Sequence, residues 1–423
     1  MSSLRNMAVW LLFASGFLVF IEPAPFEIAF LIVTLIFVFT GLRFNAFLLP
    51  MTLLLVLYNI GGGLSLINAI DNPQATWFVV ISAYMAVMAI IIACIFSEDT
   101  QRRLEWMKRG YLVAAVLASI TGIMGYFDIA GTFDLFTRYA RAVGTFKDPN
   151  VFSTFLVLPL VYTTQAIILG TAKRPLLLAI PLLIMITAVF LSFSRGAWGV
   201  TVGALMLSVL LSFLTASANK TRIRIVIIAF SGLALLIIML AVALQFDAIR
   251  QTFEVRASLN QSYDQGETGR FGNQLRSIPL LLESPNGLGP FRFREYFIDD
   301  PHNTFINAFA SYGWLGGLSY MALIACTMGV GWKLVFKRTP WQTESIAIWS
   351  TLFFLILQGM QIDTDHWRHF YVLVGLTWGL MLASLRYEAY QRHQEMLRSL
   401  AWPQAFPAPT AEWPASTGQT APR

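Results

Sequence analysis

The chain alternates long apolar runs with short polar connections. Most runs are close to 20 residues long, and a helix of that length crosses about 30 Å of hydrocarbon at about 1.5 Å per residue. The period-two alternation of strands in a membrane barrel is absent. We therefore expect twelve membrane-spanning helices, at residues 6–21, 26–41, 45–64, 76–96, 110–127, 151–171, 175–194, 196–216, 225–245, 314–335, 345–362 and 369–386.

Residues 246–302 form the one long interruption of this pattern. Within them, GRFGNQLRSIPLLLES (269–284) places Leu275, Ile278, Leu281 and Leu282 at helical spacing. We expect a short amphipathic helix on the membrane surface, with Arg270 near its start. The run that begins at residue 303 is too long for one span, so we expect Gly313 or Gly316 to break it into an interfacial piece and a crossing.

Composition agrees with this pattern. The 423 residues are 57% hydrophobic and only 12% charged, unlike an ordinary soluble domain. The sequence predicts an all-α polytopic membrane protein with about twelve transmembrane helices and one large periplasmic loop that contains short amphipathic helices. We expect one transmembrane domain over residues 1–399, with the loop 246–302 inserted before the tenth span, and a disordered cytoplasmic tail over the proline-rich residues 400–423.

The basic residues fix the expected orientation. Threading the spans from a cytoplasmic N-terminus places 18 of the 29 basic residues on the cytoplasmic side, as the positive-inside rule requires. Both termini are then cytoplasmic. Because this bias explains the net charge of +6, we expect the lipid bilayer, and no nucleic acid, as the partner of the basic residues.

The outer side has a composition of its own, because ten of its eleven basic residues are arginines and only Lys147 is a lysine. A guanidinium grips phosphate or carboxylate with two parallel hydrogen bonds, so arginines on this side suit a phosphorylated ligand. The alternative is that they pair with acidic residues of the same side. The ten are Arg138, Arg141, Arg195, Arg250, Arg256, Arg270, Arg276, Arg292, Arg294 and Arg368.

Arg195 lies in LSFSRGAW (191–198), between two apolar stretches. The two spans around it form a hairpin, and we expect a tight turn at Ser194-Arg195-Gly196 in which Gly196 takes the conformation that the turn requires. Arg195 is then held at the outer interface, where an arginine costs far less than at the bilayer centre. A simple interfacial anchor is the alternative to a ligand-binding role.

Three further stretches carry polar candidates on the outer side. RAVGTFKDPNVF (141–152) reads as a turn leading into a helix, with Asn150 as the expected N-cap. DDPHNTF (299–305) places His302 in the loop, as the best candidate for a general base, and Asn303 at a helix start. QIDTDHWRHF (361–370) has the HxxH spacing of a metal site, but a short interfacial turn with balanced charges explains it better.

Other chemistries lack support in the sequence. The centre of each expected span is free of ionisable residues, which disfavours an ion-coupled transporter. Phosphate-binding and dinucleotide-binding loops are absent as well. We therefore expect no cofactor and no catalytic metal, and we expect the energy for any reaction to arrive with the substrate.

Four stretches of the outer side together resemble the O-antigen ligase and polysaccharide polymerase superfamily of bacterial membrane glycosyltransferases. The matching stretches are GTFKDPN, SFSRGAW, an arginine followed by SPNGLGPF, and PHNTFINAFASYGWLGG, which together span residues 141 to about 318. The last is the most specific. Lys147-Asp148 stands where the family often has uncharged residues, which leaves the glycan preference open.

The resemblance implies an enzyme of the bacterial inner membrane with a periplasmic active site. Such an enzyme moves a glycan from an undecaprenyl-pyrophosphate carrier to an acceptor hydroxyl, by inverting displacement and without a metal. The acceptor is lipid A core for a ligase and another glycan for a polymerase, and twelve spans with one long loop favour a ligase. A flippase or other transporter is the alternative of a different class, and a purely structural membrane subunit is a third.

The resemblance also implies roles for individual residues. Arg195 and Arg270 match the arginines that hold the pyrophosphate, and His302 matches the histidine that activates the acceptor. We name these three as catalytic candidates. The candidates for binding substrate are Arg141, Asn150, Asn303 and Arg276.

Overall fold

The computed structural model describes residues 2–21, 23–257, 266 and 269–401. The chain divides into two compact units, Met1–Ser384 and Leu385–Arg423. The description below concerns the first unit. The expected disordered tail, residues 400–423, lies outside the described residues from position 402 onward, so its disorder stays a prediction, as does the domain boundary at 399.

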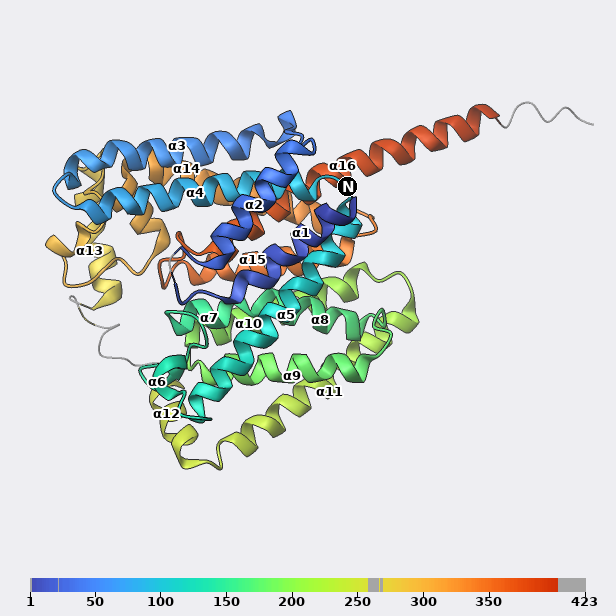
Figure 1. Cartoon of the computed structure of the whole chain (residues 1–423), viewed down its shortest axis with the longest axis horizontal. Helices are drawn as coiled ribbons and strands as arrows, with labels where there is room; N and C mark the ends of the chain where they lie inside the picture. The colour runs from blue at the N-terminus through green and yellow to red at the C-terminus, as the bar shows by residue number, and fades with distance from the viewer. Residues whose placement is uncertain (1, 22, 258–265, 267–268, 402–423) are drawn as a thin grey trace, which may run out of the picture. The chain divides into compact units, whose positions relative to one another are not determined.

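Helices make up nearly all of the regular structure (Figure 1). Two short strands, β1 (Thr137–Arg138) and β2 (Arg141–Ala142), pair antiparallel. Four 3-10 turns are η1 (Ser15–Phe17), η2 (Ala46–Leu48), η3 (Leu66–Ala69) and η4 (Phe293–Glu295). The α-helices are α1 (Ser2–Ala14), α2 (Pro25–Phe39), α3 (Leu49–Ser65), α4 (Pro73–Phe96), α5 (Thr100–Tyr126), α6 (Phe133–Phe136), α7 (Pro149–Phe155), α8 (Val157–Ile168), α9 (Pro175–Leu191), α10 (Arg195–Thr215), α11 (Asn219–Ala243), α12 (Asp247–Ala257), α13 (Arg270–Leu282), α14 (Thr304–Val335), α15 (Gln342–Gln358) and α16 (Arg368–Ala401).

Proline sets the start of several of these helices. Pro25, Pro73, Pro149 and Pro175 are the first residues of α2, α4, α7 and α9. Proline suits this position because its fixed φ is helical and its missing N–H would have no partner within the helix. Each helix therefore begins where the sequence places proline after a polar connection or a loop.

Each of the twelve expected spans falls on helical structure, which confirms an all-α polytopic membrane protein. Within the described part of the chain, eight helical segments are long and apolar enough to cross a membrane, and α2 and α9 are shorter apolar helices. One of the eight, Pro149–Ile168, consists of α7 and α8 in succession. The count of twelve crossings stays a prediction.

Helices α3 and α14 pack closely because glycines line their contact. A Cβ built on Gly61 would come within 2.6 Å of both the amide nitrogen of Gly316 and the carbonyl oxygen of Tyr312, a separation that no side chain tolerates. The rings of Tyr58 and Tyr312 stack beside this contact with centroids 4.2 Å apart. Any side chain at Gly61 would therefore push the two backbones apart.

Of the two candidate break points in the run after residue 303, Gly313 is the one used. It has φ 67° and ψ −169° inside α14, a conformation open to glycine and strained for other residues. The carbonyl of Pro285, in the connection that follows α13, accepts a hydrogen bond from the amide of Trp314 at 2.8 Å. The break separates a short piece that begins at Thr304 from the long crossing that follows.

The expected amphipathic helix is confirmed as α13. Three of the four predicted apolar residues face outward, with Leu275 70%, Ile278 45% and Leu282 63% exposed. The fourth, Leu281, is buried, as are Asn273, Gln274 and Ser277. A helix with a polar face against protein and an apolar face outward suits the membrane surface. Figure 1 shows α13, with α6 and α12, at the end of the helices opposite the N-terminus.

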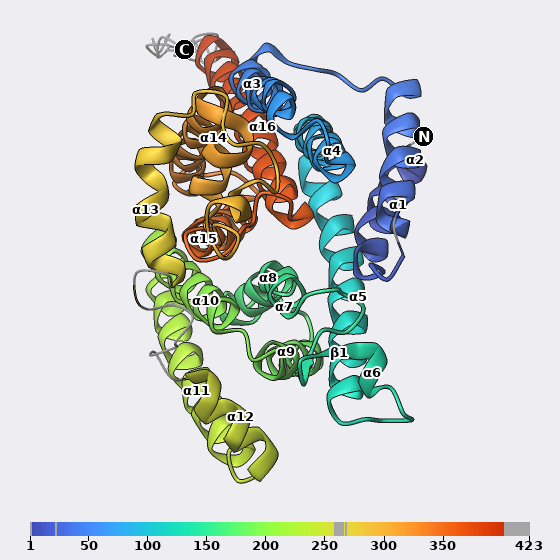
Figure 2. The same cartoon turned by 90° about the vertical axis from the view of Figure 1, so that its left-hand side faces the viewer.

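Helix α11 differs from the other long helices in its burial. Only 6% of its most apolar window is buried, and Ile225 is its one buried residue among those described. Figure 2 shows it at the edge of the helix bundle. Its apolar surface is therefore left for lipid to cover.

Candidate active site

The start of α7 corrects one expectation from the sequence. Asp148, and not Asn150, is the N-cap: its carboxylate accepts hydrogen bonds from the amides of Asn150 at 2.7 Å and Val151 at 3.3 Å. The reason is Pro149, which takes the first helical position and so makes the preceding residue the cap. The side chain of Asn150 is thereby left to bond elsewhere.

The turn between α9 and α10 corrects a second expectation. Phe193, with φ 45°, takes the left-handed conformation, and Gly196 lies in the first turn of α10. Ser194 caps that helix by accepting a hydrogen bond from the amide of Ala197 at 3.2 Å. A Cβ on Gly196 would approach Nε2 of Gln358 to 2.9 Å, so a larger residue here would displace the end of the Gln358 side chain.

Asn150 joins these two turns. Its Oδ1 accepts a hydrogen bond from Oγ of Ser194 at 2.6 Å and a longer one from Nη2 of Arg141 at 3.4 Å. Nε of Arg141 also donates to the carbonyl of Ser192 at 2.7 Å. The stretches RAVGTFKDPNVF (141–152) and LSFSRGAW (191–198), which are separate in the sequence, therefore form one polar surface.

The amphipathic helix inside the long loop, α13, reaches the same place. Nη1 of Arg270, the first residue of α13, donates to the carbonyl of Gln361 at 3.4 Å. Gln361 follows the end of α15 and lies three residues beyond Gln358, the residue against Gly196. Helix α15 thus brings Arg270 towards the start of α10.

These residues line a cavity of about 500 Å³, which we call the arginine pocket. Four arginines contribute to its wall, and among the described residues that line it none is acidic. Asn150, Gln358 and Gln361 supply neutral polar groups. Arginine guanidinium groups bind phosphate and carboxylate groups, so a cavity whose described lining is rich in arginine favours an anion. The four arginines are Arg141, Arg195, Arg256 and Arg270.

His302 lies beside Arg270 but is not among the residues that line the arginine pocket. Burial lowers the pKa of its imidazole below the ordinary value, and the positive charge of Arg270 lowers it further. The ring is therefore neutral near pH 7 and able to accept a proton. Its backbone has φ 45°, and its carbonyl accepts a hydrogen bond from Nε2 of Gln274 in α13 at 3.3 Å.

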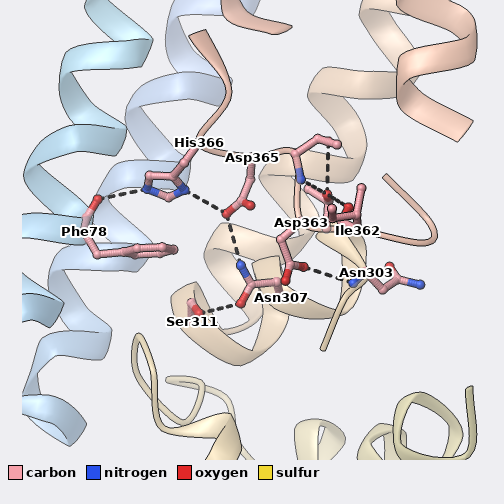
Figure 3. A network of polar contacts seen from close by, with 10 residues as sticks. Phe78, Asn303, Asn307, Ser311, Ile362, Asp363, Asp365 and His366 are labelled. Atoms are coloured by element: carbon pink, nitrogen blue, oxygen red, sulfur yellow. Dashed lines mark hydrogen bonds and ion pairs between the residues drawn. The ribbon is translucent and has the colours of Figure 1, made fainter. Parts of the chain in front are cut away.

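A carboxylate also holds the segment around His302 (Figure 3). Asp363, in the connection between α15 and α16, accepts backbone hydrogen bonds from Asn303, at 3.0 Å, and from His302. Burial raises the pKa of the Asp363 carboxyl, and the negative charge of Asp365 raises it further. Asn303 is confirmed as the N-cap of α14, with its Oδ1 accepting from the amides of Phe305 and Ile306.

The HxxH stretch belongs to a buried network (Figure 3). The ring nitrogens of His366 lie 3.1 Å from Oδ2 of Asp365 and 3.0 Å from the carbonyl oxygen of Phe78. Asn307 donates to the same Oδ2 at 3.1 Å and accepts from Oγ of Ser311 at 2.8 Å. Over the described residues, no cluster of three or more histidine, cysteine or acidic side chains could hold a metal ion. The structural explanation of this stretch stays a prediction.

Arg276 lies away from the arginine pocket. It is exposed on α13, where its Nη2 donates to Oδ1 of Asn273 at 2.6 Å and its guanidinium lies 5.7 Å from the ring centroid of Phe297. Its role in binding substrate stays a prediction, as does that of Asn303. Arg141, Asn150, Arg195 and Arg270 are the predicted residues that the structure brings together.

Several arginines of the outer side form ion pairs with acidic residues, as the alternative to binding a phosphorylated ligand predicts. Arg294 pairs with Asp300, and Arg292 pairs with both Asp71 and Glu295. In two further pairs, Arg250 binds Asp247 and Arg368 binds Glu27. These four arginines are distinct from the four in the pocket.

Sequence reasoning did not single out Arg256, Gln358 or Gln361. Arg256 is one of the ten outer arginines, but nothing in its neighbourhood along the chain distinguishes it from the others. The two glutamines end an apolar helix and resemble ordinary interfacial residues. Their place in the pocket depends on how α12 and α15 pack, and a single sequence does not reveal that.

Comparison with known protein families gives one match. Residues 180–321 match the family model described as O-antigen ligase. The matched segment includes Arg195, Arg270, His302 and the Gly313 break. None of the curated proteins matches the chain. The family match confirms the resemblance to the O-antigen ligase superfamily and supports a ligase-like or polymerase-like function in general terms.

Proposed function

We propose that this protein transfers a glycan from an undecaprenyl-pyrophosphate carrier to a hydroxyl group of an acceptor, at the periplasmic face of the bacterial inner membrane. The observation that carries the proposal is the arginine pocket, with four arginines in its wall and the partly buried imidazole of His302 near Arg270. The O-antigen ligase match over residues 180–321 supports the same chemistry.

The arginine pocket suits the departing group of this reaction. When the bond between the anomeric carbon and the pyrophosphate oxygen breaks, its electron pair stays on that oxygen and negative charge builds there. Fixed guanidinium groups stabilise such charge most strongly where they are already oriented and little water competes. Arg141 and Arg270 are anchored by hydrogen bonds to backbone carbonyls, so little reorganisation is needed as the charge develops.

His302 suits the other half of the reaction. The acceptor hydroxyl oxygen forms the new bond to the anomeric carbon, and its proton passes to the imidazole. One base is enough because the leaving group is already activated, so a single displacement inverts the anomeric configuration. The products are the glycosylated acceptor and the undecaprenyl pyrophosphate, and the imidazolium returns its proton to water.

Transfer in a reconstituted system tests this proposal. The purified chain in liposomes is given lipid-linked glycan and candidate acceptors, and the new glycosidic bond is detected by mass spectrometry. We expect product from the wild type and a loss of at least about 100-fold with His302→Ala, within the range for general base catalysis. Full activity of that variant, or movement of the glycan across sealed vesicles with no new bond, contradicts the proposal; the second outcome supports a transporter.

The acceptor separates a ligase from a polymerase. Both reactions use the same donor pocket and the same base, and they differ only in the molecule that supplies the hydroxyl. We propose the ligase, with lipid A core as acceptor, because the long loop and the expected twelve spans fit it. Supplying lipid A core and unattached glycan in one assay decides between them: product on the glycan alone establishes the polymerase.

A further inference from the structure

His302 has a backbone conformation that is uncommon for any residue other than glycine. Its φ is 45°, in the left-handed region, where a side chain is strained. Such a conformation persists only where the surrounding structure holds it. The backbone contacts of His302 therefore show what fixes the position of the proposed base.

Gln274 of α13 holds the two carbonyl groups around His302. Its Nε2 donates to the carbonyl of Pro301 at 3.0 Å and to the carbonyl of His302 at 3.3 Å. Because carbonyl oxygens only accept hydrogen bonds, these two contacts also fix which end of the Gln274 amide faces the loop. The residue is only 8% exposed, so little water competes for these bonds.

Asp363 holds the two amide groups around His302 and belongs to a different element, the connection between α15 and α16. Its carboxylate accepts hydrogen bonds from the amide of Asn303, at 3.0 Å, and from the amide of His302 (Figure 3). The carbonyls and the amides around the base are therefore held by residues that are far apart in the sequence.

These bonds together determine both backbone angles of His302. A peptide unit is planar, so a unit that is held at its carbonyl and at its amide has a fixed orientation. The unit that joins Pro301 to His302 is bound at its carbonyl by Gln274 and at its amide by Asp363. The unit that joins His302 to Asn303 is held in the same way. Since the units on both sides are fixed, so is the direction in which the imidazole leaves the backbone.

The elements that hold His302 also build the arginine pocket. Arg270 lines the pocket and lies four residues before Gln274, so both side chains lie on one face of α13. Gln361 lines the pocket as well and lies two residues before Asp363. Each element thus contributes one residue to the pocket and one to the hold on His302, which sets the place of the imidazole relative to the pocket.

We propose that Gln274 and Asp363 are positioning residues for glycan transfer, which together hold the imidazole of His302 at a set distance and direction from the arginine pocket. We call this pair the backbone clamp. The clamp acts through His302 and not on the substrate. This inference rests on the proposed function for its effect on transfer, whereas the position of His302 is tested without substrate.

The clamp keeps the imidazole of His302 among four charged side chains. Burial lowers its pKa most, and Arg270 lowers it further. Asp300 and Asp299 raise the pKa, and Arg294 lowers it. Release of the clamp lets the ring move into water and away from Arg270, so the pKa should rise towards the ordinary value of a histidine.

NMR of the full chain in lipid nanodiscs tests the clamp. The chain has four histidines, so histidine labelled with ¹³C gives few signals, and the signal that His302→Ala removes is that of His302. Gln274→Met keeps the length of the side chain and removes its hydrogen bonds, and we expect it to raise the pKa of His302 towards about 6.5. Gln245→Met is the control, because Nε2 of Gln245 donates at 3.2 Å to Ala241, one helical turn earlier, at an exposed site.

Asp363 provides a second pair of variants in the other element. Asp363→Ala removes the acceptor of both amides, and we expect the same rise in the pKa of His302 as in Gln274→Met. Asp363→Asn keeps one acceptor oxygen, so its effect should be smaller. Both variants lack the acidic group, so a difference between them reports hydrogen bonding and not charge. A wild-type pKa of His302 in any folded variant that lacks these bonds overturns the proposal.

Transfer kinetics test the effect of the clamp on the reaction. We expect Gln274→Met to lower kcat about 10- to 100-fold, as for a catalytic group displaced by about 1 Å. The KM for the donor should stay near the wild-type value, because the arginine pocket keeps its lining. The fall of the rate at low pH should move to higher pH together with the pKa of His302. A raised KM at unchanged kcat overturns the proposal.

The failures of the two proposals are distinguishable. If no glycan is transferred in any assay but the variants raise the pKa of His302, the proposed reaction is wrong while the clamp stands. If transfer proceeds and the variants leave both the pKa and kcat unchanged, the clamp is wrong while the reaction stands.

Discussion

The hydroxyl of Ser194 donates a hydrogen bond of 2.6 Å to Oδ1 of Asn150, across 44 residues of sequence. The bond ties the start of α10 to the first turn of α7. Since Arg195 follows Ser194 directly, and Arg141 donates to the same oxygen, Asn150 sets the spacing of two arginines in the pocket.

Replacing Asn150 tests that positioning role. We expect Asn150→Ala to reduce glycan transfer by about tenfold or more, since it removes the shared acceptor of Ser194 and Arg141 and takes the acceptor away from the buried hydroxyl of Ser194. Asn59→Ala is the control, because Nδ2 of Asn59 donates only within its own helix, to the carbonyl of Leu55. Initial rates of both variants provide the measurement, and equal rates would show that Asn150 does not position the arginines.

Two substitutions of Arg195 separate the effect of its charge on the transfer rate from the effect of its planar geometry. We expect Arg195→Ala to lower the rate of transfer by about 100- to 1,000-fold, as when one preorganised donor to a developing anion is lost. Arg195→Lys keeps the charge but loses the planar fork, so its rate should fall between those of the wild type and Arg195→Ala. Arg250→Ala, which breaks an exposed ion pair with Asp247, serves as the control. An unchanged rate in Arg195→Ala would remove this arginine from the site.

His302 gives a prediction for pH. Burial and the charge of Arg270 hold its pKa below the ordinary value, so the neutral base persists to lower pH than a free imidazole allows. The rate of transfer should be level near pH 7 and fall as the pH drops through this lowered pKa. Replacing Arg270 by glutamine removes a positive charge, so the midpoint of the residual activity should move to higher pH. A midpoint that stays fixed would show that another group titrates.

Gly313 gives a prediction for stability. A Cβ at this position would lie 2.5 Å from the carbonyl oxygen of Pro285, at φ 67°. We expect Gly313→Ala to destabilise the fold by about 1–3 kcal/mol, the cost of one residue in a strained conformation, and to lower the unfolding temperature in detergent. Gly329→Ala, on the same helix with nothing within 4 Å of its Cβ, should change it little. Equal unfolding temperatures would refute the strain.

Metal removal gives a fifth prediction. If arginines alone stabilise the departing pyrophosphate, transfer should continue at the same rate after EDTA treatment. Loss of activity with EDTA, followed by recovery with a divalent ion, would show that a metal shares the charge of the leaving group. Donor binding should be followed in the same samples, so that a change in affinity is separated from a change in rate.

The helices were predictable because their signal is local. An apolar run of sufficient length must bury its backbone polar groups in a helix wherever lipid surrounds it, so the twelve runs fall on helices. The N-cap of α7 was predictable in principle too, since Pro149 at the first position makes Asp148 the cap. The interpretation of Asn150 as the cap overlooked that signal.

The site was only partly predictable. The motif blocks contain Arg141, Asn150, Arg195 and Arg270, and the structure gathers these four in one cavity. Arg256 belongs to none of the blocks, and its position depends on α12. Phe193 takes the left-handed conformation although a glycine lies three residues on. How the helices around the arginine pocket pack involves residues far apart in the sequence, which no local pattern records.

The low burial of α11 has a consequence for how its sequence can vary and for its response to membrane thickness. Only Ile225 is buried among its described residues. Most of its side chains therefore need only be apolar enough for lipid, and need not fit the shape of a neighbouring helix. Its sequence is free to drift among apolar residues, and its tilt should follow bilayer thickness. Helix α12 begins four residues after α11 ends, and Arg256 of α12 lines the arginine pocket. We therefore expect a change in bilayer thickness that tilts α11 to shift Arg256 within that pocket.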